Sequence, residues 1–199
     1  MLEQRIQQHF IDSADLKYQA AYSLAKPVEQ AVAALLACVT SGGKVLACGN
    51  GAAAGAAQQY AALCVGRFER ERPELGAIAL VADSLGLAGI AGDNEWRDGF
   101  ARRVRALGQA GDVLLAITAL GACANVLRAV EAAHERDMSV VALTGAGGGA
   151  VGAALHETDV HISVPHERPA RIHEVHLLLL HCLADGVDTQ LLGDEDPTA

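Results

Sequence analysis

Residues 48–55, with the sequence CGNGAAAG, have the composition of a loop that binds a phosphate group. They follow an apolar, strand-like run at 44–47 and open an alanine-rich helix. A turn of this kind points successive backbone N–H groups and the positive end of the helix dipole at one spot. Sites for sugar phosphates normally add Ser or Thr hydroxyls, and this chain has alanine there instead. The loop therefore predicts an anion-binding scaffold that has lost most of its side-chain ligands.

Two further loops are expected beside the first one. Residues 117–123 (ITALGAC) and 144–149 (TGAGGG) also follow apolar runs, and ligands in parallel sheets bind outside the carboxyl ends of the strands. Thr118 and Thr144 carry the only hydroxyl groups in these three loops. The alternative is that all three are only the tight strand-to-helix turns that any such fold requires.

The elements that position these loops alternate along the chain. Short apolar runs predict five buried strands, and helical patterns separate them, which indicates a parallel sheet covered on both faces. We predict an α/β fold, a doubly wound three-layer α-β-α sandwich with a helical N-terminal extension. The expected strands are 44–48, 77–81, 112–117, 139–143 and 159–164; the expected helices are 2–24, 27–39 (begun by Pro27), 53–66, 84–106, 122–136, 148–154 and 168–191.

Length and charge restrict the classes of function. The 199 residues suit a single domain over 1–199, with N-terminal helices (1–41), an α/β core (42–192) and an acidic tail (193–199). The net charge of −9 disfavours direct binding to nucleic acid. The N-terminus is polar and amphipathic, so we expect no signal peptide, no membrane association and a cytoplasmic location. Five scattered cysteines without CxxC pairs predict reduced thiols.

Several segments together resemble the sugar isomerase (SIS) family, in the branch of phosphoheptose isomerases and DnaA initiator-associating proteins. The resemblance covers nearly the whole chain and implies the SIS fold and a homotetramer, with residues 1–41 serving oligomerisation. The segments that carry it are CGNG at 48–51, RFERERP at 67–73, RALG at 105–108, GDVLLAI at 111–117, VALTG at 141–145 and ARIHEVH at 170–176.

The resemblance also implies which positions bind a ligand. Active isomerases have Ser where this chain has Ala53, and a hydroxyl-rich loop where it has 118–123, so only Thr118 remains among four phosphate-binding hydroxyls. Each lost neutral hydrogen bond is worth roughly 0.5–1.5 kcal/mol, so we expect at most weak binding of a phosphosugar or anion. The implied ligand-binding residues are Gly49, Asn50, Gly51, Ala53, Asp93, Thr118, Gly121, Cys123 and His173.

The catalytic positions differ more strongly from the family. The family's metal-binding His and Glu on the helix after the first loop correspond to Gln59 and Leu63, and Leu cannot accept a proton. On the last helix, the family's Gln and His correspond to His173 and His181. We therefore predict no catalytic residue beyond the retained His181, and a chain that is not an enzyme.

No cofactor is expected, although a metal ion remains an alternative. His173 and His176 share a helix face, and His181 lies about a turn and a half further along. Zinc held by His181 and His173 is one interpretation, and packed or hydrogen-bonded histidines at a subunit interface are the other. The run from Arg67 to Arg72 alternates with Glu and predicts a solvated or inter-subunit ion-pair segment.

The favoured function is a catalytically degenerate scaffold. Leu191 and Leu192 end the last helix on different faces, which indicates a partner-binding surface or ordinary docking of the C-terminus. The resemblance implies that the partner is the replication initiator DnaA, collected by the tetramer in the regulation of chromosome replication. The alternative is a sedoheptulose 7-phosphate isomerase or a phosphosugar sensor.

Overall fold

The structure is a computed structural model and describes residues 1–83, 85–86, 88–89 and 96–193. At its centre lies a five-stranded sheet in the order β2-β1-β3-β4-β5, and every neighbouring pair is parallel. This confirms the predicted α/β class and sheet. The strands are β1 (Val45–Gly49), β2 (Ala77–Ala79), β3 (Val113–Ile117), β4 (Ser139–Thr144) and β5 (Val160–Ser163).

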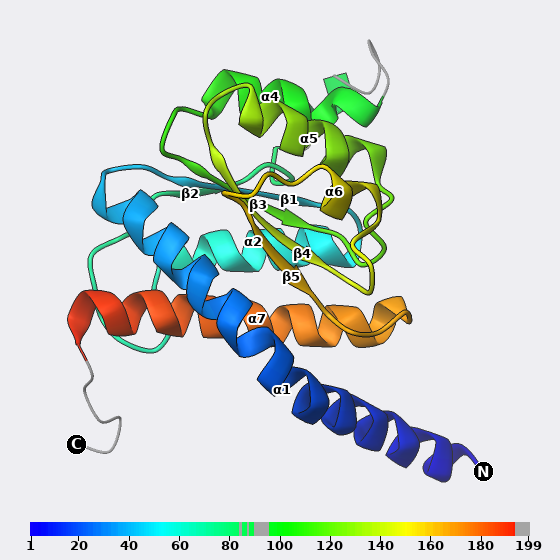
Figure 1. Cartoon of the computed structure of the whole chain (residues 1–199). Coiled ribbons are helices and arrows are strands. Elements are labelled where there is room, and N and C mark those ends of the chain that lie inside the picture. Colours follow the sequence, from blue (N-terminus) through cyan, green and yellow to red (C-terminus); the bar gives the residue numbers. More distant parts are fainter. Residues whose placement is uncertain (84, 87, 90–95, 194–199) are drawn as a thin grey trace.

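Helices cover both faces of the sheet, because its central strands are apolar at every position. Successive side chains of β3 alternate between two cores: Leu115 packs in one cluster, and Leu114 and Ala116 pack in the other. One layer holds α1 (Leu2–Thr40), α2 (Ala52–Val65) and α7 (Pro169–Leu192) (Figure 1). The other holds η1 (Trp96–Asp98), α4 (Gly99–Leu107), α5 (Ala124–His134) and α6 (Gly149–Ala153).

The N-terminal extension is one helix, so the prediction of two helices separated at Pro27 is wrong. The helix α1 continues from Leu2 to Thr40 with Pro27 inside it. A proline removes one backbone hydrogen bond and crowds the preceding turn, at a cost of about 3 kcal/mol. Leu24 and Ala31, on either side of it, are both buried in the core, and this packing holds the two halves in line.

The other predicted helices agree with the structure to within about two residues at each end, with one qualification. The expected helix over 84–106 falls partly outside the described residues, and η1 and α4 form its described part. Among the helices that the structure describes, none combines the length and the apolar character needed to cross a bilayer. The cytoplasmic location stays a prediction.

The order of the strands creates a switch point. The connection from β1 through α2 leads to β2 on one side, whereas the connection from β3 through α5 leads to β4 on the other. The two crossovers diverge from neighbouring strands, so a crevice opens between the carboxyl ends of β1 and β3. The loops at 50–51 and 118–123 border this crevice.

Candidate active site

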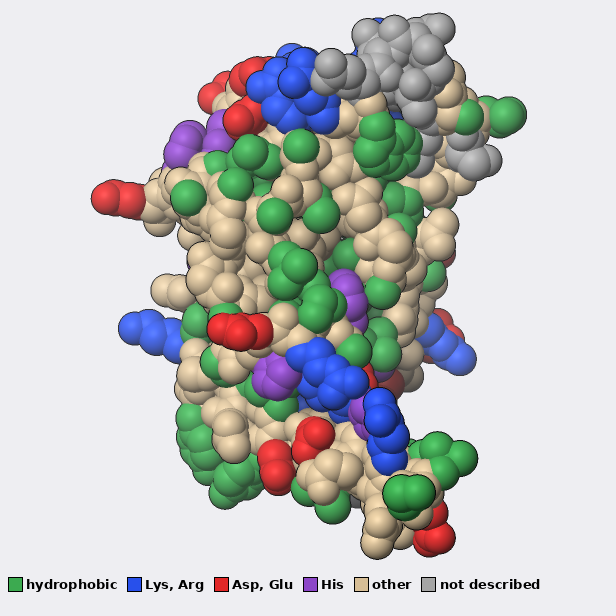
Figure 2. Space-filling model, turned by 90° about the vertical axis from the view of Figure 1, so that its right-hand side faces the viewer, with side chains coloured by type: hydrophobic (Ala, Val, Ile, Leu, Met, Phe, Trp, Pro, Cys, Tyr) green, Lys and Arg blue, Asp and Glu red, His purple; other side chains and the backbone are tan. Residues whose placement is uncertain are grey.

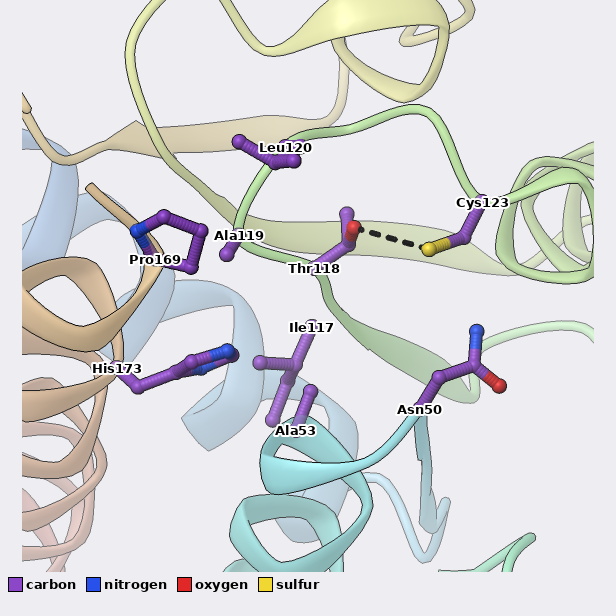
Figure 3. Close-up of a pocket in the computed structure, with 9 residues that line it drawn as sticks. All are labelled: Asn50, Ala53, Ile117, Thr118, Ala119, Leu120, Cys123, Pro169 and His173. Atoms are coloured by element: carbon purple, nitrogen blue, oxygen red, sulfur yellow. Dashed lines mark hydrogen bonds between the residues drawn. The ribbon is translucent and has the colours of Figure 1, made fainter. Parts of the chain in front are cut away.

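A pocket of about 220 Å³ lies at this switch point and is the candidate active site (Figure 3). The loop after β1, the loop after β3 and the start of α7 each contribute to its wall. Most of the wall is apolar, with a few polar atoms directed inward, as is usual for small-molecule sites. The lining residues are Asn50, Ala53, Ile117, Thr118, Ala119, Leu120, Cys123, Pro169 and His173.

The loop after β1 brings the first turn of α2 against the end of β3. A Cβ atom at Gly49 would lie 2.7 Å from the Cβ of Ala53 and 2.8 Å from the carbonyl oxygen of Ile117, so only glycine fits there. Gly51 is the N-cap of α2 with a φ of 56°, a conformation that favours glycine. Of the predicted binding residues in this loop, Asn50 and Ala53 line the pocket, and the two glycines shape it.

The loop after β3 is organised by Thr118. Its Oγ1 accepts a hydrogen bond from the backbone N–H of Gly121 at 3.2 Å and lies 3.6 Å from the Cys123 sulfur (Figure 3). Gly121 has a φ of +65°, and a Cβ atom there would lie 1.8 Å from the carbonyl oxygen of Gly148. The third glycine-rich loop, 144–149, therefore supports the pocket from behind and does not line it.

His173 is the titratable imidazole that faces the pocket (Figure 3). It is half-buried, and this desolvation lowers the pKa of its imidazole below the ordinary value. His173 is therefore neutral at pH 7 and able to accept a proton. The family resemblance implied a ligand-binding role for this residue, and the structure places it at the pocket without testing that role.

His176, three residues further, is a core residue. It is fully buried, and its Nε2–H donates a hydrogen bond to the carbonyl oxygen of Thr144 at 3.1 Å. Burial, opposed by this hydrogen bond, lowers its pKa to about 4. His176 ties α7 to the end of β4 and takes no part in the pocket lining.

His181 lies elsewhere on α7. The side-chain amide of Gln59 donates a hydrogen bond to His181 Nε2 at 3.1 Å, and the His181 ring lies 5.4 Å from the ring of Phe68. Neither Gln59 nor His181 lines the pocket, and half-buried Leu63 lies one turn of α2 beyond Gln59. The imidazole nitrogen of His181 that could accept a proton is thus engaged by an amide.

The metal site of the family does not fit these residues within one chain. His173 and His181 are eight positions apart on α7, about 12 Å along the helix axis, which is too far to share one ion. Leu63 offers no ligand atom, and among the described residues no group of three metal-ligating side chains includes either histidine. We therefore derive no chemical step through a metal at this site.

The remaining predicted site residues are placed as follows. Asp93 lies outside the described residues. Leu191 and Leu192, at the end of α7, are each 37% exposed, so both face solvent in the isolated chain. Four residues that line the pocket were not among the predicted binding residues: Pro169, and Ile117, Ala119 and Leu120 of the predicted loop 117–123. Asn125, behind the wall, was not among them either. Asn125 could have been found, because it lies in the first turn after a predicted binding loop.

Comparison with known proteins places the chain in a family. The SIS domain family matches residues 9–145. The phosphoheptose isomerase of Methylibium petroleiphilum is 62% identical over 100% of this chain and 99% of its own length. The chain belongs to the SIS domain family. A phosphoheptose isomerase of Azoarcus sp. is 54% identical over 96% of this chain and 98% of its own.

Solved structures of SIS proteins agree with this assignment. Phosphoheptose isomerase from Neisseria gonorrhoeae has a TM-score of 0.91 and 46% identity, covering 95% of this chain and 100% of its own. The enzyme from Francisella tularensis has a TM-score of 0.92 and 39% identity, covering 95% and 99%. The predicted SIS fold is confirmed.

These findings contradict the predicted function. The chain was expected to be a non-enzymatic scaffold for a replication initiator, whereas the relatives that cover its full length are named as isomerases. The expectation that Leu191 and Leu192 bind DnaA depended on that scaffold interpretation and is withdrawn with it. The error came from treating Leu63 as decisive, which assumed that the proton acceptor must occupy one fixed position.

Proposed function

We propose that this SIS domain protein is a phosphosugar isomerase that interconverts a ketose phosphate and an aldose phosphate of the sedoheptulose 7-phosphate class. The observation that carries the proposal is the His173 imidazole, held neutral by burial, on the wall of the switch-point pocket. The names of the full-length relatives support the substrate class.

The phosphate group would bind at the start of α2 and beside the loop after β3. The N-terminal turn of α2, which holds Ala53 on the pocket wall, presents the positive end of the helix dipole. Thr118 adds a hydroxyl from the opposite wall. These groups replace the hydroxyls absent at Ala53 and in the 118–123 loop, which explains how a phosphate could bind without them.

His173 would move the proton. Starting from the ketose, its neutral imidazole removes a proton from C1, the electron pair of that bond forms the C1=C2 double bond, and the C2 carbonyl oxygen takes up the negative charge of the enediolate. The O1 hydroxyl proton passes to O2 and the imidazolium returns its proton to C2, which leaves an aldehyde at C1 and a hydroxyl at C2. A base whose pKa lies near or below neutrality is free to accept the proton at pH 7.

Assembly into a homo-oligomer forms part of the proposal. The first half of α1 extends beyond the sheet layers (Figure 1), and apolar side chains are exposed at the lower end of the molecule in Figure 2. Several exposed apolar side chains on a projecting helix favour burial against a second copy of the chain. The exposed side chains on this half include Leu2 (72%), Ile6 (49%), Phe10 (74%), Ile11 (51%), Tyr18 (73%) and Tyr22 (81%).

The test is an isomerisation assay with sedoheptulose 7-phosphate on the purified protein and two variants. His173→Ala should reduce kcat by at least about 100-fold, the usual range for a lost general base, while KM changes little. His181→Ala should retain most of kcat, because that residue contacts Gln59 and not the pocket. Circular dichroism and size-exclusion chromatography would verify that each variant stays folded and assembled.

Two results would overturn this assignment. Absence of turnover by the wild-type protein, even where calorimetry detects substrate binding, would indicate a phosphosugar sensor. Turnover that survives His173→Ala but disappears with His181→Ala would place the base at His181.

A further inference from the structure

A second group of ligating side chains lies at the amino ends of β4 and β5, whereas the pocket lies at the carboxyl ends of the strands. His134 is the last residue of α5, and His156 and Asp159 lie in the turn that leads from α6 into β5. We propose that His134, His156 and Asp159 bind a divalent transition-metal ion of the zinc class. This site does not depend on the proposed isomerase activity.

The three side chains already converge. One ligand atom from each residue lies within 4.8 Å of the other two. His134 Nε2 is 2.8 Å from Asp159 Oδ2, and the rings of His134 and His156 are stacked with centroids 3.6 Å apart and an interplanar angle of 14°. Two imidazoles and one carboxylate form a ligand set that suits zinc and its neighbours in the first transition series.

The carboxylate is fixed in place before any ion arrives. The Asp159 side chain is 1% exposed. Its Oδ1 accepts a hydrogen bond from the backbone N–H of Val140 at 2.9 Å, and its Oδ2 accepts one from the backbone N–H of His156 at 2.7 Å. A buried, oriented anion that faces two imidazoles provides the negative charge that a divalent cation requires.

The stacked rings place both imidazoles beside the carboxylate. The ring centroids of His134 and His156 are 3.6 Å apart, and a ligand atom of each lies within 4.8 Å of an Asp159 oxygen. Neutral imidazole is the form that coordinates a metal. The competing explanation is a simple ion pair between protonated His134 and Asp159, and the experiment below separates the two.

Only a small movement would complete the site. Ligand atoms on a tetrahedral zinc ion lie about 3.3 Å apart, given metal–ligand distances near 2.0–2.1 Å. His134 Nε2 and Asp159 Oδ2, now 2.8 Å apart in a hydrogen bond, would separate by about 0.5 Å to reach this spacing. His156 is exposed and can rotate towards them, with water as the fourth ligand. The ion would then link the end of α5 to the start of β5.

The test is isothermal titration of the intact protein with Zn²⁺, comparing two neighbouring variants. His156→Ala removes a ligand from an exposed position, whereas the matched control Glu157→Gln removes an adjacent exposed carboxylate outside the cluster. We expect one Zn²⁺ per chain at this site, affinity at least tenfold weaker in His156→Ala, and no change in Glu157→Gln. Zinc should raise the Tm of the wild type and the control but not of His156→Ala.

The outcomes are unambiguous. Absence of zinc binding, or binding that neither His156→Ala nor His134→Ala weakens, would overturn the proposal and leave the ion pair as the explanation. Zinc that binds elsewhere on the chain would still bind to both variants. The decisive measurement is therefore the loss of one bound Zn²⁺ per chain in His156→Ala. This experiment measures zinc binding and not turnover. A negative result here is therefore distinguishable from a negative result in the isomerase assay.

Discussion

The side-chain amides of Asn50 and Asn125 hydrogen-bond to each other twice, each donating to the other's carbonyl oxygen at 2.8 Å. Asn50 follows β1, and Asn125 lies buried in the first turn of α5, so this reciprocal pair joins the two loops that border the pocket. The loops are 75 residues apart in sequence. The pocket geometry therefore depends on Asn125, a residue outside the pocket lining that holds the lining residue Asn50.

Asn125→Ala should loosen the pocket and destabilise the fold. The substitution leaves the amide of Asn50 unpaired next to the cavity, which costs about 1–3 kcal/mol. Urea unfolding should show this loss, and KM for the sugar phosphate should rise. An unchanged midpoint and an unchanged KM would show that the pair contributes nothing to the site.

Ala53→Ser should strengthen phosphate binding. Ala53 is buried on the pocket wall, and a hydroxyl there would provide a hydrogen bond worth about 0.5–1.5 kcal/mol, or roughly two- to tenfold in Kd. Calorimetry with sedoheptulose 7-phosphate would measure it, with Ala54→Ser, one position along and outside the pocket lining, as the control. Weaker binding in Ala53→Ser than in the control would contradict the placement of the phosphate.

His176 should make the protein less stable in acid. Its pKa is about 4 when folded and about 6.5 when unfolded, so the unfolded chain binds more protons between these values. Stability from this residue is therefore present above pH 6.5 and is lost as the pH falls towards 4. Between pH 7 and pH 5 the free energy of unfolding should drop by about 2 kcal/mol.

The variant His176→Asn isolates this effect from other titrating groups. It removes the imidazole, so the difference in unfolding free energy between wild type and variant should shrink from pH 7 to pH 5. Urea titrations at both pH values would measure it. A difference that does not depend on pH would show that His176 titrates normally in the folded state.

Arg72→Met should be among the most damaging substitutions outside the site. Arg72 Nε donates to Asp188 Oδ1 at 2.6 Å, with side chains only 1% and 3% exposed. Removing the guanidinium leaves a buried, uncompensated carboxylate, which typically costs 3–5 kcal/mol. Arg105→Met, which breaks an exposed pair with Glu135, is the matched control and should cost at most about 1 kcal/mol. Denaturant unfolding would measure both losses of unfolding free energy. Equal losses in the two variants would contradict the expected difference between a buried and an exposed ion pair.

This ion pair also corrects a prediction from sequence. The run from Arg67 to Arg72 was interpreted as a solvated or inter-subunit segment, and the Arg67–Glu71 pair is indeed exposed. Arg72 instead reaches into the core and also donates to the carbonyl oxygens of Leu63 and Cys64. Nothing in an alternating charge pattern shows that the carboxylate partner of Arg72 lies 116 residues away.

The sequence by itself determined the sheet, the helices around it and the loops at the carboxyl ends of its strands. Apolar runs and helical periodicity are patterns within short segments of the chain, so they predict strands and helices without knowledge of the tertiary structure. Gly49 and Gly121 lie where two segments of backbone pack closely together, and a side chain at either position would not fit.

Only the tertiary structure decided which side chains meet. It directed His173 into the pocket and His176 into the core, joined Asn50 to Asn125, and brought His134 to His156 and Asp159. It also kept α1 continuous through Pro27 by packing residues on both sides of the proline into the core. Such contacts join residues far apart in the chain, and their geometry follows from how whole layers pack, which no local pattern of residues encodes.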